Sequence, residues 1–248
     1  MSEKSPLFEY QNNSEFADER SFANGLIPTD FDARNIRLWK LAGDSGKLVR
    51  ENEPAQNQTI EHLEQSLEEA KVLFSHMQQR YGINVVSMDL RKEKNKEGNE
   101  VIYTLVDNID GSNLAELENL PEEAKEELEN LYIALGQYYH DAWKQNQKYW
   151  GDARSDQFVY GTKAEQQDKH FYLIDVDPEF YNEGDDQWHT IEAVLASVCH
   201  DLVANEDKFT PKEHFTKARK ELLKIVQNIL TQQPSLGMLV EARGWLEN

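Results

Sequence analysis

The chain has 248 residues, 39% of them hydrophobic, and 26 Lys and Arg against 46 Asp and Glu, which gives a formal charge of −20. This is enough apolar material for a folded core, so a wholly disordered chain is excluded. The negative field repels phosphate backbones and anionic lipid, and we therefore expect no binding to nucleic acid or to a membrane surface.

Cysteine usage and hydropathy indicate the compartment. Cys199 is the only cysteine, so no intrachain disulfide can form, as is typical of a reducing environment. No apolar run approaches the roughly 18 residues of a membrane-spanning helix, and residues 1–13 lack the apolar core of a signal peptide. We expect a cytoplasmic protein.

The first 110 residues predict a polar arm followed by hairpin, helix and hairpin. Residues 1–30 are polar and predict an irregular arm. Strand-like residues 36–41 and 47–50 flank a Gly-Asp-Ser-Gly turn and predict a hairpin. Apolar residues recur every three or four positions over 59–80, which predicts a helix, and residues 84–90 and 101–106 predict a second hairpin with a charged loop.

The rest of the chain is mainly helical. Pro121 suits the first turn of a helix that continues to about residue 147. Residues 158–160 and 170–176 predict a third hairpin. Three further helices are expected: one at about 188–204, one that begins after Thr210, and one over 236–246. Thr210 and Glu213 have the spacing of a capping box at the start of the second of these.

One stretch carries chemistry. The predicted long helix leads into Tyr149-Trp150-Gly151-Asp152, Gln157 follows Asp152 by five residues, and the apolar run Phe171-Tyr172-Leu173-Ile174 ends at Asp175. Phosphoryl transfer needs a carboxylate that orients the acceptor hydroxyl and oxygen ligands that hold Mg²⁺ on the phosphates. This pattern resembles the catalytic loop and metal-binding strand of the protein-kinase-like superfamily, in particular phosphotransferases of the aminoglycoside type.

The resemblance implies an α+β, two-lobed fold: an arm at 1–30, a small β-rich N-lobe with one bridging helix at 31–110, and a mainly helical C-lobe at 111–248. It implies ATP and Mg²⁺ as cofactors, with Asp152 as catalytic base and Gln157 and Asp175 as metal ligands. The strand cation would be Lys47 or Arg50, braced by Glu64 or Glu68 on the bridging helix. Val106 and Asn108 would lie at the hinge that meets the adenine ring.

The implied activity is transfer of phosphate to a hydroxyl of a small molecule or a protein. Three differences from the family pattern favour an alternative, a pseudokinase-like module that binds nucleotide or protein without turnover. Gln157 stands where Asn is expected, the clamp cation is ambiguous, and no glycine-rich phosphate loop precedes residue 50. A third hypothesis, an acidic interaction protein that mimics nucleic acid, has only the charge in its favour.

Two other motif matches are rejected. Ile174-Asp175-Val176-Asp177 resembles the nucleophile motif of haloacid-dehalogenase phosphatases, but mostly helices follow it and Pro178-Glu179 replaces the expected Gly-Thr. The same Asp-x-Asp occurs in some glycosyltransferases, but no βαβ units precede it here. Neither of these functions is expected.

Overall fold

The computed structural model describes residues 22–28, 37–164, 166–185 and 189–248. Contacts divide the chain into two compact units. The first unit consists of the chain up to Gln65 together with Ser87–Asn108, and the second consists of Ser66–Val86 together with Ile109–Asn248. The first long helix was predicted to lie wholly in the N-terminal part, whereas most of it groups with the second unit. The predicted boundary near residue 110 lies close to the observed junction at Asn108.

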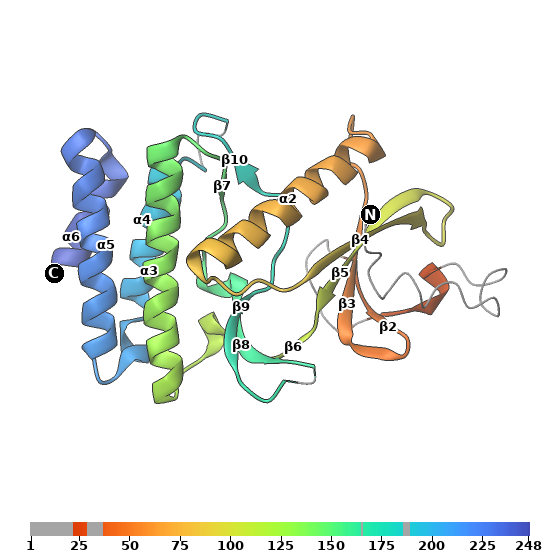
Figure 1. Ribbon diagram of the computed structural model, residues 1–248, viewed down its shortest axis with the longest axis horizontal. Helices are drawn as coiled ribbons and strands as arrows, with labels where there is room; N and C mark the ends of the chain where they lie inside the picture. The colour runs from red at the N-terminus through yellow and green to blue at the C-terminus, as the bar shows by residue number, and fades with distance from the viewer. Residues whose placement is uncertain (1–21, 29–36, 165, 186–188) are drawn as a thin grey trace. The chain divides into compact units, whose positions relative to one another are not determined.

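The first unit is an antiparallel five-stranded sheet in the order β1-β2-β3-β5-β4 (Figure 1). Its strands are β1 (Leu26–Pro28), β2 (Arg37–Leu41), β3 (Asp44–Asn52), β4 (Met88–Lys94) and β5 (Glu100–Asp107). Gly43 and Gly98 take positive φ angles of 84° and 86° in the two hairpin turns, where a side chain would be strained. Both predicted hairpins are confirmed.

The faces of this sheet follow from strand alternation. Val49, Val101, Tyr103 and Leu105 point to one side and form a core cluster with Leu26 of β1. Residues 26–28 were expected in the irregular arm, but they pair with β2 as an edge strand, and the short 3₁₀ turn Phe22–Gly25 precedes them. Most of the predicted arm lies outside the described residues.

Helix α2 (Ile60–Tyr81) forms where the three- and four-residue apolar spacing predicted it. The Thr59 hydroxyl accepts the backbone N–H of His62 at 3.2 Å and caps the first turn. Gly82 ends the helix with a φ of 72°.

The second unit contains two small sheets. Strands β6 (Ile109–Asn113), β8 (Phe158–Lys163) and β9 (His170–Leu173) form one, and β7 (Tyr149–Trp150) pairs with β10 (Phe180–Tyr181) in the other. The hairpin predicted at 158–176 is β8-β9. β6 approaches β8 so closely that a Cβ atom on Gly111 would lie 2.3 Å from a backbone oxygen, so this crossing requires glycine.

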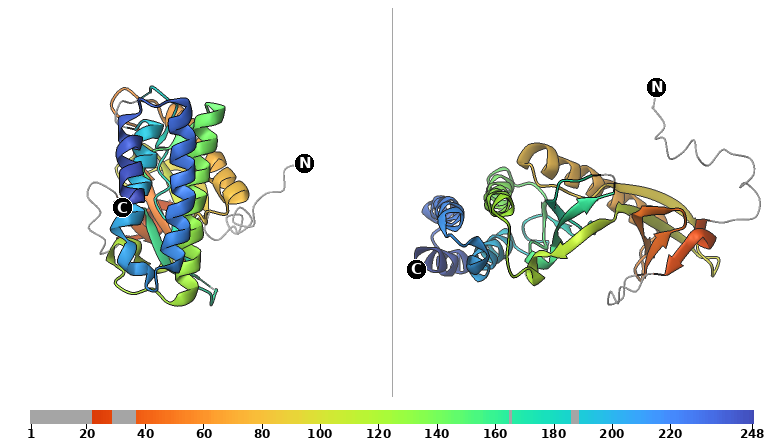
Figure 2. Two further views of the ribbon diagram at one scale, coloured as in Figure 1. Left: turned by 90° about the vertical axis from the view of Figure 1, so that its left-hand side faces the viewer. Right: turned by 90° about the horizontal axis from the view of Figure 1, so that it is seen from below.

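Four helices complete the second unit: α3 (Glu122–Gln145), α4 (Ile191–Ala204), α5 (Glu213–Gln232) and α6 (Gly237–Glu247), with short 3₁₀ turns at Leu114–Glu116, Ser155–Gln157 and Glu206–Phe209. Figures 1 and 2 show α3 and α5 side by side. Gly136 permits this contact, because a Cβ atom there would lie 2.3 Å from the Leu222 side chain.

One helix boundary differs from the prediction. The capping box proposed for Thr210 and Glu213 does not form: α5 follows Lys212, no side chain caps it, and the Thr210 hydroxyl donates to the Asp207 carbonyl oxygen at 3.1 Å. Helix α4 begins at Ile191 after the Thr190 cap, and Trp188, the expected start, lies outside the described residues.

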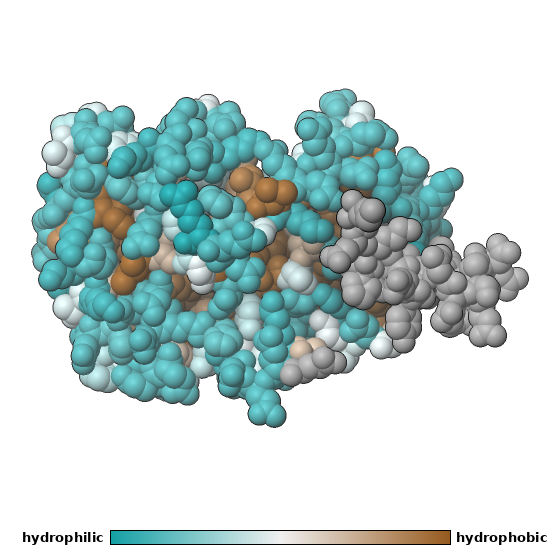
Figure 3. All heavy atoms as spheres, viewed as in Figure 1, coloured by the Kyte–Doolittle hydropathy of each residue, from teal (hydrophilic) through white to brown (hydrophobic). Residues whose placement is uncertain are grey.

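The α+β class and the order of sheet, long helix, sheet and helical region are confirmed. No helix within the described ranges combines the length and apolarity needed to cross a bilayer. The visible surface in Figure 3 is predominantly hydrophilic with smaller hydrophobic areas, in keeping with the high charged content.

Candidate functional site

The predicted catalytic loop is held in place by buried tyrosines of α3. The Tyr138 hydroxyl accepts the Trp150 N–H at 2.9 Å, and the Tyr139 hydroxyl donates to the Trp150 carbonyl oxygen at 2.8 Å. Gly151 comes next, and a Cβ atom there would lie 2.4 Å from the Tyr181 ring. The close packing against Tyr181 therefore requires glycine at this position.

Asp152 lies between two side chains of its own loop. Its Oδ1 and Oδ2 atoms accept from Arg154 Nε at 2.5 Å and Nη2 at 2.9 Å, and Oδ2 also accepts from Gln157 Nε2 at 2.8 Å. The hydrogen bond to Asp152 raises the pKa of the Arg154 guanidinium. Because 57% of the Arg154 side chain is exposed, against 20% for Asp152, the guanidinium can move away more readily than the carboxylate.

Gln157 and Asp175 come together through strand pairing. Phe158 of β8 pairs with Leu173 of β9. At the next position, the backbone N–H of Ile174 donates to the backbone carbonyl oxygen of Gln157 at 3.0 Å. Asp175 follows directly. The hairpin thus places Asp175 next in the chain to the residue that pairs with Gln157, at the start of β8.

Several carboxylates gather around this point. Burial raises the pKa of Glu179, and the neighbouring charges of Asp152, Asp177 and Asp175 add to the rise, with His189 opposing it. Glu179 is tied to the loop, since its carbonyl oxygen accepts the Gly151 N–H at 2.9 Å. Such a group of like charges is relieved by a bound cation.

This carboxylate group is not a preformed metal cage. Within the described ranges, no three or more His, Cys, Asp or Glu side chains are arranged to hold a metal ion by themselves. Mg²⁺ commonly takes only one or two protein carboxylates and completes its shell with water and substrate phosphates. The sequence motif offers two oxygen donors for such a site, the carboxylate of Asp175 and the side-chain amide oxygen of Gln157.

A cavity of about 450 Å³ opens beside Asp152. Residues of the catalytic loop, of the segment after Asp175 and of helix α4 line it: Gly151, Asp152, Ala153, Arg154, Glu179, His189, Ala193, Val194 and Ser197. The His189 ring stacks on Tyr181 with centroids 4.6 Å apart. The cavity is large enough for a small acceptor molecule.

Sequence reasoning missed four of these lining residues, Arg154, Glu179, His189 and Ser197. Arg154 had a detectable signal, because it stands two residues from the proposed base. Glu179, His189 and Ser197 have no such signal in the sequence, because they reach Asp152 only where β10 and α4 fold back over the loop.

Lys47, in the first unit, is held by the end of β5. Its Nζ atom donates to Asp107 Oδ1 at 2.7 Å and to Ser87 Oγ at 2.8 Å. Asp107 also accepts from the Ser87 N–H and hydroxyl, at 2.9 and 2.7 Å. Lys47 thus has a structural role in this arrangement, at the end of β5.

Arg50 lies on the face of the sheet opposite to Lys47 and Val49, with Thr104 as its cross-strand neighbour. The predicted bracing glutamates make other contacts or face solvent. Glu64 accepts from Lys92 Nζ at 3.1 Å, and Glu68 is exposed.

The predicted hinge residues lie at the end of β5. Val106 is buried between Leu48 and Met88 in the ladder. Asn108 donates its N–H to the Gly46 carbonyl oxygen at 2.8 Å and its side-chain amide to the Ser45 carbonyl oxygen at 3.1 Å. The backbone donor of Asn108 is therefore already used by the β2–β3 turn.

Comparison with known proteins adds likeness at the level of fold. No protein-family model matches the chain, and no curated protein sequence matches it. Similar solved structures include WbdD, at 15% identity and a TM-score of 0.37, covering 80% of this chain and 45% of that one. WbdD with the kinase inhibitor LY294002 gives 15% identity and a TM-score of 0.40, covering 82% and 48%.

A third similar structure is the Cydia pomonella granulovirus kinase PK-1, at 14% identity and a TM-score of 0.47, covering 83% of this chain and 80% of that one. This chain has the element order of a protein-kinase-like fold. It spans less than half the length of WbdD, which is described as a bifunctional kinase-methyltransferase. At these identities and TM-scores the similar structures assign this chain neither an activity, a substrate nor a cofactor.

Proposed function

We propose that this chain binds ATP with Mg²⁺ and transfers phosphate to a hydroxyl of a small molecule or protein that binds beside Asp152. The observation that carries the proposal is the position of Asp152: it lines an open cavity, is oriented by Gln157 and Arg154, and has Asp175 among the carboxylates of its surroundings. General-base catalysis needs such an oriented carboxylate within reach of the acceptor hydroxyl.

In the proposed mechanism Asp152 accepts the proton of the acceptor hydroxyl as that oxygen attacks the γ-phosphorus of ATP. The bond from the γ-phosphorus to the bridging oxygen breaks, and ADP leaves. The side-chain N–H of Gln157 keeps the Asp152 carboxylate in position. The side-chain oxygen of Gln157 and the carboxylate of Asp175 would hold Mg²⁺. The metal would supply charge neutralisation on the phosphates. Arg50 would contact the phosphates, and the end of β5 at Val106 and Asn108 would meet the adenine.

Acceptor binding would require Arg154 to release at least one oxygen of Asp152. The guanidinium forms two hydrogen bonds to the carboxylate, so in this arrangement the base is neutralised by its neighbour. Movement of this exposed side chain would free the carboxylate and place a cation at the edge of the cavity. The proposed catalytic cycle therefore includes a rotation of Arg154.

A second candidate function is a pseudokinase-like module that binds nucleotide or a protein without turnover. The contacts of Lys47 and Asn108 favour it, because a family-type phosphate clamp and hinge donor are here engaged within the first unit. The pairing of Arg154 with Asp152 favours it as well. In its nucleotide-binding form this module binds the same nucleotide as the first candidate but transfers no phosphate.

Thermal stability with ATP and Mg²⁺, compared with ATP and a chelator, tests the shared part. The wild type and Asp168→Ala, an exposed control, should be stabilised only when the metal is present, and Asp175→Ala should lose this effect. Absence of stabilisation in the wild type would contradict the enzyme and the nucleotide-binding form of the second candidate.

Transfer of labelled γ-phosphate to water or to a panel of hydroxyl compounds separates the two candidates. For the enzyme, Asp152→Asn should reduce transfer by about 10²- to 10⁴-fold. The exposed control Asp168→Asn should stay near wild type. Nucleotide binding with no transfer to water or to any panel compound, or with transfer that Asp152→Asn leaves unchanged, would overturn the role of Asp152.

A further inference from the structure

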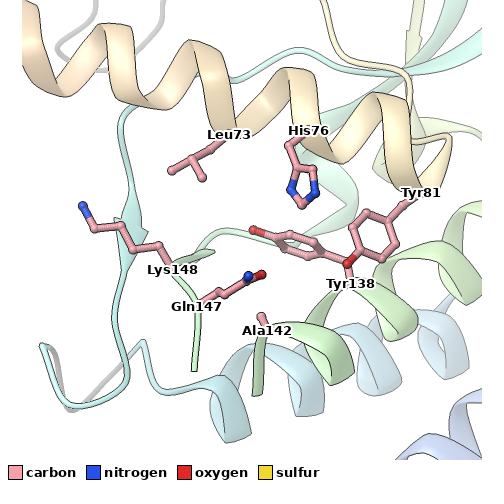
Figure 4. A pocket seen from close by; sticks show the side chains of 7 residues that line it. All are labelled: Leu73, His76, Tyr81, Tyr138, Ala142, Gln147 and Lys148. Atoms are coloured by element: carbon pink, nitrogen blue, oxygen red, sulfur yellow. The ribbon is translucent and has the colours of Figure 1, made fainter. Parts of the chain in front are cut away.

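A second cavity lies within the second unit and shares no lining residue with the cavity beside Asp152. Its volume is about 330 Å³, at the small end of the range of about 300–1,000 Å³ seen for ligand pockets. Helices α2 and α3 and the segment after α3 line it through Leu73, His76, Tyr81, Tyr138, Ala142, Gln147 and Lys148 (Figure 4). We call it the Tyr138 cavity.

The walls of the Tyr138 cavity are largely aromatic and aliphatic. The rings of Tyr81 and Tyr138 meet edge to face, with centroids 5.4 Å apart at 80°, and His76 packs against Tyr81 at 6.0 Å and 81°. Leu73 and Ala142 add aliphatic surface. Such walls favour a compact apolar ring, which can pack edge to face against the tyrosines.

The hydroxyl of Tyr138 is one polar group of the cavity. The Tyr138 oxygen accepts the Trp150 N–H, and none of the described residues accepts the O–H of Tyr138 itself, although the residue is 5% exposed. Figure 4 shows this hydroxyl directed into the space between Leu73 and Gln147. A buried donor that lacks an acceptor favours a ligand that supplies one.

The charge of the ligand follows from the surroundings. Lys148 on the rim is already paired with Glu69 at 2.8 Å, and the Tyr81 hydroxyl donates to the carboxylate of Asp141 at 3.1 Å. The chain as a whole carries −20. An anionic ligand would be repelled by this field, so the acceptor is expected on a neutral group such as an amide or ketone.

We propose that the Tyr138 cavity binds a compact, uncharged aromatic molecule with one carbonyl oxygen, which accepts the Tyr138 O–H. The site is linked to the catalytic loop, because the same hydroxyl holds the N–H of Trp150, two residues before Asp152. A ligand in the cavity should therefore change the environment of the Trp150 backbone amide. Binding itself does not depend on the phosphotransfer proposed above.

Benzamide is a suitable probe, titrated into the nucleotide-free full chain and followed by the backbone amide of Trp150 in ¹H–¹⁵N NMR. The expected result is a saturable shift of that amide. Leu73→Trp, which fills the cavity, should weaken binding by about tenfold or more, while Val72→Trp, on the neighbouring exposed position, should stay within about twofold. A shift that does not saturate, or equal affinity in both variants, would overturn the proposal.

A comparison of probes on the unaltered chain removes the dependence on folding of a variant. Toluene has the ring of benzamide without its carbonyl group, and it should bind about tenfold more weakly if the Tyr138 O–H is used. Equal affinity for toluene and benzamide would show that the hydroxyl plays no part. In that case the assigned ligand class is wrong.

Discussion

The side-chain amide of Gln157 donates a hydrogen bond to the carboxylate of Asp152, with Nε2 and Oδ2 2.8 Å apart. Gln157 is buried and Asp152 is partly exposed, so the amide is the fixed partner and the carboxylate the one that it orients. A residue that the motif assigned to metal binding thus also positions the proposed base.

Replacement of Gln157 by Glu tests this hydrogen bond. The change removes a donor and places a second carboxylate against Asp152, so the free energy of unfolding should fall by about 1–3 kcal/mol at pH 7. Urea unfolding measures it. Gln137→Glu, at an exposed position of α3, is the matched control and should change stability by about 0.5 kcal/mol at most. Equal effects would mean that the amide does not hold Asp152.

The contact between Lys47 and Asp107 can be measured by a double-mutant cycle with Lys47→Met and Asp107→Asn. Both side chains are mostly buried, at 20% and 15% exposure, and we expect a coupling energy of about 1 kcal/mol or more. The exposed pair Lys224 and Glu221 should give about 0.5 kcal/mol or less. Coupling as small as in this control would remove the structural role of Lys47.

Nucleotide affinity distinguishes the two predicted clamp cations. If Arg50 contacts the phosphates, Arg50→Met should weaken binding of ATP with Mg²⁺ by about tenfold or more, and Lys47→Met should have the smaller effect. Isothermal calorimetry on both variants measures it. The opposite order would return the clamp to Lys47.

Tyr132 holds α3 to α4 through a buried hydrogen-bond network. Its hydroxyl donates to Asp201 at 2.7 Å and accepts from Asn205 Nδ2 at 3.1 Å. Tyr132→Phe leaves both partners short of a contact and should lower stability by about 1–3 kcal/mol in urea unfolding. Tyr160→Phe is the control, because no described residue bonds to that hydroxyl, and it should stay within about 0.5 kcal/mol. Similar losses in both would contradict the network.

The buried thiol of Cys199 should make the free energy of unfolding depend on pH. Burial raises the pKa of this thiol to about 12, whereas an unfolded cysteine titrates near about 8.5. As pH rises above the unfolded value, only the unfolded state releases the proton, so stability falls. Between about pH 7.5 and 9.5 the wild type, kept reduced, should lose about 1.4 kcal/mol more than Cys199→Ala. Parallel pH profiles would mean that the thiol ionises in the folded state.

Local features of the sequence determined most of the elements. Spacing of three and four residues predicted α2 and α3, turn residues predicted three hairpins, and Asp152 and Asp175 followed from motifs of a few residues each. These signals work because helix periodicity and turn geometry depend on neighbours along the chain. The failed capping box at Thr210 shows the limit, since its hydroxyl found another nearby carbonyl.

Tertiary structure decided what the side chains contact. Lys47 and Asp107 are 60 positions apart and meet only because β3 pairs with β5 in that register. Glu179 and His189 reach Asp152 because β10 pairs with β7 and α4 follows, and no periodic pattern records this. The sequence by itself determined which residues could do phosphoryl chemistry. Long-range strand pairing and burial determined which of them stand together, because these depend on contacts that form only when the chain is folded.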